Sequence, residues 1–158
     1  MTASGSIHMA AATASLLLGA FQLARTRRDR LHRRAGYTYA AAMLLTNLTA
    51  LLIYEFTRGF NIFHALALLS LFTLGMALKP MLTRPRPADW RTMHYYWVTW
   101  SYAGLCAAAM TEFLVRVMLV PGWKSAAIGT PLILVPAAWL IARYAPRGRT
   151  PRYADAGH

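Results

Sequence analysis

Four histidines could bind a metal ion or a haem iron, because each lies near the end of an apolar stretch of the chain. They are His8, His32, His64 and His94, whereas the fifth, His158, is the last residue. A neutral imidazole is a ligand for haem iron, zinc, copper and non-haem iron. Ionisable groups within a membrane segment are costly and are functional candidates by default. What these histidines can do depends on the elements that carry them.

The composition is that of a membrane protein. The chain has 158 residues, of which 57% are hydrophobic and only 14% are charged, and its mean hydropathy is +0.35. About a quarter of a soluble domain is charged. The 17 Lys and Arg residues occur in blocks between apolar runs, which indicates topology determinants and no nucleic-acid partner. A single cysteine, Cys106, excludes an internal disulfide and a cysteine-based metal cluster.

The apolar runs predict an all-α integral membrane protein with a single domain over residues 1–158. Five transmembrane helices are expected, near residues 7–24, 36–57, 61–79, 94–119 and 125–144. The first run lacks the positive leader of a signal peptide, so we expect it in the mature protein. Short connections predict an up-down-up-down bundle of the first four helices, with the first diagonal to the third and the second to the fourth. Pro131 and Pro136 are expected to kink the fifth helix, which packs outside the bundle.

The basic residues predict the orientation of the chain in the membrane. Arginine-rich segments at 25–34 and 84–91 and the tail after residue 142 lie on one side if all five runs span. The connections on the other side contain only Arg58 and Lys124. The positive-inside rule then places the N-terminus outside and the C-terminus in the cytoplasm. We therefore expect a multi-pass protein of the bacterial inner membrane, with the lipid bilayer as its surroundings.

The predicted bundle sorts the histidines into two diagonal pairs at two depths. His8 and His64 belong to the outer level, and His32 and His94 belong to the inner level. A rise of about 1.5 Å per residue separates the two levels by roughly 20 Å. Two imidazoles that face each other from different helices can hold a haem iron from both sides. The pattern predicts two b-type haems, one at each level.

Two glutamates in the outer half offer an alternative site. Glu112 follows His94 by 18 residues, or five helical turns, and so lies on the same face of its helix. Arg116, at i+4 from Glu112, favours a structural ion pair. A divalent zinc, copper or iron ion could instead be bound near the outer face by nitrogen and oxygen ligands. The residues of this alternative site are His8, His64, Glu55 and Glu112.

Several segments together resemble a known family. They are residues 5–8, 31–39, 61–67 and 93–94, followed by 100–102 and 112–116, and they include an HRRxGxxY pattern from His32 to Tyr39. The chain is similar over roughly residues 5–118 to a bacterial family of predicted membrane proteins catalogued as a domain of unknown function, number twenty-three-oh-six. That resemblance implies a small helical membrane protein and little about activity. By architecture alone, the diagonal histidines also resemble diheme transmembrane cytochromes of the b561 type.

These observations favour a transmembrane electron-transfer protein. Electrons would pass from a cytoplasmic or quinol donor to an outer acceptor such as ferric iron, as in a transmembrane oxidoreductase of the cytochrome b type. Binding or transport of a divalent metal ion is one alternative. A structural membrane subunit whose histidines only join helices is another. In each case the chain could form homo-oligomers.

Overall fold

A computed structural model describes residues 3–25, 27–53 and 59–146 of the protein. Over those residues its secondary-structure elements are all helices. The helices are α1 (Ala3–Ala24), α2 (Arg30–Leu51), α3 (Ile62–Leu82), α4 (Trp90–Arg116) and α5 (Gly122–Arg143). The predicted all-α fold with five helices is therefore confirmed.

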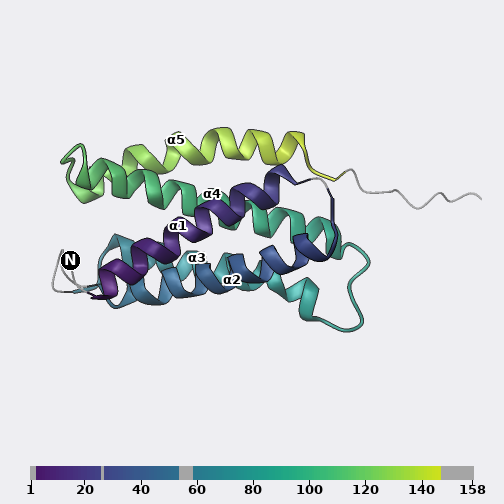
Figure 1. Ribbon diagram of the computed structural model, residues 1–158. Coiled ribbons are helices and arrows are strands. Elements are labelled where there is room, and N and C mark those ends of the chain that lie inside the picture. Colours follow the sequence, from purple (N-terminus) through teal and green to yellow (C-terminus); the bar gives the residue numbers. More distant parts are fainter. Residues whose placement is uncertain (1–2, 26, 54–58, 147–158) are drawn as a thin grey trace, which may run out of the picture.

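Consecutive helices run antiparallel to one another (Figure 1). The helix α1 contacts α2 and α4, α3 contacts the same two helices, and α5 packs against α4. The first four helices thus form a bundle in which α1 lies diagonal to α3, and α2 diagonal to α4. This is the order that the short connections predict.

The helix α2 begins and ends six residues earlier than the predicted range of 36–57, which is therefore wrong. Its N-cap is Asp29, whose side chain accepts a hydrogen bond of 3.0 Å from the backbone N–H of His32. A capping carboxylate satisfies a backbone donor that the first helical turn leaves free, so the helix begins within the basic segment. It ends at Leu51, and residues 54–58 lie outside the described residues.

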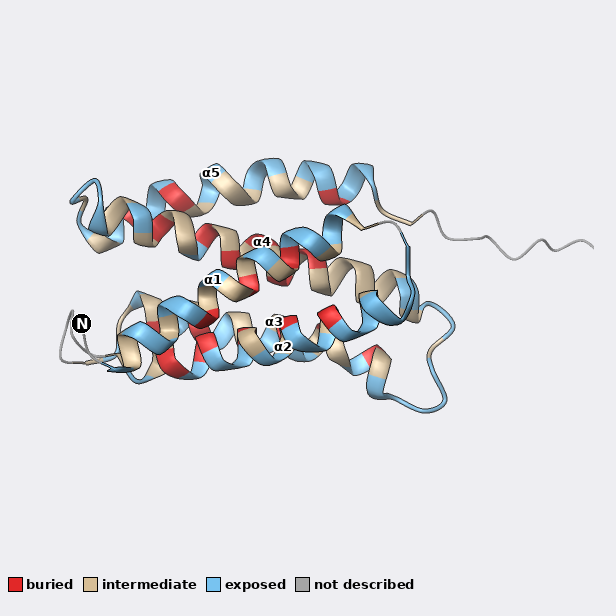
Figure 2. Cartoon of the chain, viewed as in Figure 1, coloured by how far each residue is buried: buried red, intermediate tan, exposed pale blue. Residues whose placement is uncertain are grey.

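Four of the helices, α1, α3, α4 and α5, are long and apolar enough to span a membrane. The helix α2 is not among the helices that are apolar enough to span, and three arginines lie in its first five residues. Buried positions face the space between the helices, whereas exposed positions cover the outside of the bundle (Figure 2). Large apolar side chains such as Leu17, Phe72 and Trp139 lie on that outside. An apolar exterior suits contact with lipid, and the chain is a multi-pass membrane protein.

The centre of the bundle combines a small apolar core with polar side chains that bond to their own helix. The core consists of Tyr39, Met43, Leu74 and Leu105. Ser15 is fully buried, and its hydroxyl donates to the carbonyl of Ala11, four residues earlier. Such bonds satisfy hydroxyl groups inside a membrane bundle without a partner from another helix.

The two ends of the bundle differ in the number of arginines that their segments contain. The connection from α1 to α2, the connection from α3 to α4 and the end of α5 lie together, and we call this the arginine-rich end. The start of α1, the end of α2, the start of α3 and the connection from α4 to α5 lie at the opposite end (Figure 1). The location of the arginine-rich end in the cytoplasm stays a prediction.

Candidate functional site

Each end of the bundle carries one histidine pair on diagonal helices. At the arginine-rich end, His32 lies in the first turn of α2 and His94 in the second turn of α4. At the opposite end, His8 lies in the second turn of α1 and His64 in the first turn of α3. The hydrogen bonds of the four imidazoles differ, and they decide which ring nitrogens can act as ligands.

The imidazole of His94 is oriented by the neighbouring helix α3. Its Nδ1 lies 2.9 Å from the carbonyl oxygen of Ala77. A carbonyl only accepts, so Nδ1 must carry the proton and donate it. In a neutral ring the lone pair is then on Nε2. This is the tautomer of a metal-bound histidine, whose second nitrogen is commonly held by a carbonyl group.

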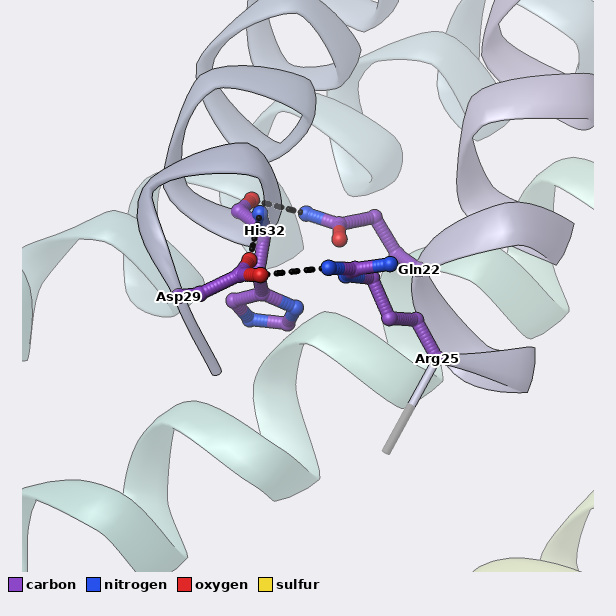
Figure 3. A network of polar contacts seen from close by, with 4 residues as sticks. All are labelled: Gln22, Arg25, Asp29 and His32. Atoms are coloured by element: carbon purple, nitrogen blue, oxygen red, sulfur yellow. Dashed lines mark hydrogen bonds and ion pairs between the residues drawn. The ribbon is translucent and has the colours of Figure 1, made fainter. Parts of the chain in front are cut away.

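The backbone of His32 is held by a polar network between α1 and α2 (Figure 3). Gln22 Nε2 donates a bond of 2.8 Å to the carbonyl of His32, and Asp29 accepts from its backbone N–H. Arg25 pairs with Asp29 at 2.5 Å. The imidazole itself extends away from these backbone groups (Figure 3). The network therefore fixes the backbone of His32. The imidazole remains available to another partner.

The charges around His32 favour its neutral form. Burial lowers the pKa of His32, and the charges of Arg28 and His94 lower it further, whereas Asp29 opposes them. The backbone N–H of His32 and the Arg25 guanidinium in turn lower the pKa of Asp29. His94 lies at the same end of the bundle as His32, on the diagonal helix α4. The neutral form of imidazole is the one that binds a metal.

Three buried polar atoms of this network have no hydrogen-bond partner within the described part of the chain. They are Gln22 Oε1, Arg25 Nε and Nδ1 of His32. Buried polar groups normally have a partner, so each exception requires an explanation such as a ligand or a water molecule. Sequence analysis found the two histidines but missed Arg25 and Asp29 as parts of the site. In the sequence, these two residues are marked only by their i,i+4 spacing and opposite charge, within a segment that is predicted to be a basic loop.

At the opposite end, His8 also has the tautomer of a ligand. Its Nδ1 lies 3.0 Å from the carbonyl oxygen of Thr46 and 3.1 Å from Thr49 Oγ1, both on α2. The Thr49 hydroxyl lies within donating distance of two carbonyls of its own helix, so its oxygen can accept from Nδ1–H. Nε2 of the neutral ring is again an acceptor.

The imidazole of His64 has the opposite tautomer from those of His8 and His94. Its Nδ1 accepts a hydrogen bond of 3.2 Å from the backbone N–H of Asn61, and Asn61 in turn caps the first turn of α3. An accepting Nδ1 places the proton of the neutral ring on Nε2. A protonated nitrogen cannot ligate iron. Ligation by Nε2 would require that its proton is lost or moves to Nδ1, and a protonated Nδ1 could no longer accept the hydrogen bond of the capping box. The ring is 1% exposed and stacks on Phe60 at 5.5 Å.

Of the two acids of the alternative metal site, the structure describes Glu112. Glu112 forms an ion pair with Arg116 on its own helix, as the spacing predicts. Their side chains are 28% and 46% exposed, so the pair belongs to the exposed class that contributes at most about 1 kcal/mol. Glu55 lies outside the described residues. Within the described ranges, no three His, Cys, Asp or Glu side chains form a group that could hold a metal ion.

Comparison with known proteins identifies a family to which most of the chain belongs. The family model described as "Predicted membrane protein (DUF2306)" matches residues 5–147. The resemblance over residues 5–118 is thereby confirmed and extends through α5. No curated protein and no solved structure matches the chain.

Proposed function

We propose that this chain, which belongs to the DUF2306 family of predicted membrane proteins, is an electron-transfer protein with a b-type haem between His32 and His94. One observation carries the proposal: His32 and His94 lie on diagonal helices at the arginine-rich end, and α3 holds His94 in the tautomer of a ligand. Diagonal helices are suited to this role because a macrocycle can lie between them with one imidazole on each face.

The number of histidines favours haem over a bare metal ion. A structural zinc site needs four protein ligands and a catalytic one needs three. A haem supplies four nitrogens of its own, so two histidines complete its coordination. Over the described residues, His32 and His94 form no group with a third His, Cys, Asp or Glu that could hold a metal ion. Binding of a divalent ion through His8, His64, Glu55 and Glu112 stays a prediction.

The unpartnered atoms near His32 support the same ligand. A haem carries two propionate carboxylates, and a buried guanidinium N–H is a strong donor for a carboxylate. Arg25 Nε is such a donor, buried and without a partner among the described residues. When bound, the haem would accept and release single electrons. His32 and His94 would each hold its iron through a ring nitrogen and so influence its potential.

The proposal is confined to one haem because of the hydrogen bonds at the opposite end. His8 presents an accepting Nε2, but the neutral ring of His64 has its proton on Nε2. A second haem between His8 and His64 stays a prediction from the sequence. Electrons would enter the proposed haem from a cytoplasmic reductant or a quinol, and would leave it to an acceptor such as ferric iron.

The haem content of the purified protein tests this proposal. The chain is expressed with a supply of haem precursor, purified in detergent, and examined by absorption spectroscopy before and after reduction. We expect the bands of a b-type cytochrome and about one haem per chain by the pyridine haemochrome method. A colourless protein that is folded and helical by circular dichroism would overturn the proposal.

A further inference from the structure

A cavity lies between the helices, largely in the half of the bundle away from the arginine-rich end. Its volume is about 950 Å³, and residues of all five helices line it. Sites for small molecules measure roughly 300–1,000 Å³, so this cavity lies at the upper end of that range. Small residues on α4 create the space. A Cβ atom added to one of them, Gly104, would meet no other atom within 4 Å.

The lining indicates a ligand that comes from the bilayer. It is mostly apolar and includes the aromatic rings of Trp97, Trp100 and Phe113. Among the described lining residues, the formally charged ones are Glu112 and Arg116, and these two neutralise each other as an ion pair. Because Glu112 already matches Arg116, the described lining offers no second cation for a phosphate headgroup. The polar part of the ligand is therefore expected to be neutral.

One histidine of this cavity can accept a hydrogen bond from a ligand. His8 lines the cavity, and its Nδ1 already donates to the carbonyl of Thr46. The remaining Nε2 of the neutral ring can only accept. An ether or a ketone could not donate to this nitrogen, but a hydroxyl group could.

We propose that the cavity binds a lipid-soluble hydroquinone, with a phenolic hydroxyl that donates to His8 Nε2. Its ring and apolar tail occupy the part of the cavity lined by tryptophan and small residues. The site does not require the haem at the arginine-rich end, so either assignment can fail without the other.

Two probes and one substitution test the role of His8. Decyl-hydroquinone and its dimethyl ether, which lacks the hydroxyl protons, are bound to the purified protein in detergent and measured by equilibrium dialysis. We expect the hydroquinone to bind about 3- to 10-fold more tightly, the effect of one hydrogen bond. The His8→Leu variant should bind both probes equally. Equal binding by the unmodified protein, or an unchanged preference in the variant, would overturn the proposal.

A matched pair of glycine variants tests the location of the site. Gly104 lines the large cavity, whereas Gly75 of α3 lies outside its lining, and an added Cβ would meet nothing within 4 Å at either position. We expect Gly104→Leu to weaken hydroquinone binding about 10-fold or more by filling the cavity, and Gly75→Leu to leave it unchanged. Equal affinity in both variants would overturn the proposal. So would a stoichiometric phospholipid in organic extracts that the hydroquinone does not displace, or a second haem ligated by His8.

Discussion

Replacement of His94 by alanine is expected to remove the haem from the purified protein while the helices stay folded. The substitution deletes one of the two proposed axial ligands and the bond to the Ala77 carbonyl. Loss of a second-shell partner already costs about 10- to 100-fold in metal affinity, so loss of a ligand should lower haem affinity by at least as much. His32→Ala should have the same effect. Haem content is measured by pyridine haemochrome, and folding by circular dichroism.

His8→Ala is the matched control, because it also deletes a half-buried imidazole that bonds to a carbonyl of a neighbouring helix. We expect this variant to keep about one haem per chain. Imidazole added during purification should restore haem to His94→Ala by occupying the vacated position. Full haem content in His94→Ala, or loss of haem in His8→Ala but not in His94→Ala, would contradict the assignment of the ligands.

Replacement of Gly19 by alanine should destabilise the bundle. An added Cβ atom would lie 2.2 Å from the Tyr102 ring and 3.1 Å from the Tyr39 ring. The Tyr102 hydroxyl donates to the carbonyl of Leu16 at 3.2 Å, which limits how far that ring can move away. Overpacking of this kind costs about 1–3 kcal/mol. The measurement is thermal unfolding in one detergent, followed by circular dichroism.

The control for this variant is Gly104→Ala, since a Cβ there meets no atom within 4 Å. Alanine is favoured over glycine inside a helix by roughly 0.5–1 kcal/mol, so this control should be neutral or slightly more stable. Equal unfolding temperatures for Gly19→Ala and the unmodified protein would show that α1 and α4 do not pack as closely as described.

Hydropathy predicts which segments form helices, but it does not predict where a helix begins when its first turn is polar. The apolar runs identified five helices and their antiparallel order, because burial from water requires long apolar segments and short connections allow only neighbouring helices. The start of α2 was missed because a side-chain cap sets it. Asp29 bonds to the backbone of His32 and extends the helix into a segment that hydropathy assigns to a loop.

The spacing of the histidines predicts their level in the bundle but not their protonation. The diagonal placement follows from topology, and the sequence alone therefore treats both pairs alike. Only the hydrogen bonds separate them: the Nδ1 of His94 faces a carbonyl, whereas the Nδ1 of His64 faces a backbone N–H. That difference arises from contacts with a neighbouring helix in one case and from a local capping box in the other, and neither has a periodic signature.

Ligation of one haem by two imidazoles can be tested by electron paramagnetic resonance of the oxidised, unmodified protein. A ferric haem with two nitrogen ligands from histidine is six-coordinate and low-spin. We predict a single low-spin signal of the bis-imidazole type that accounts for about one haem per chain. A high-spin signal, the signal of a single histidine ligand, or the absence of ferric haem from the folded protein would contradict the account.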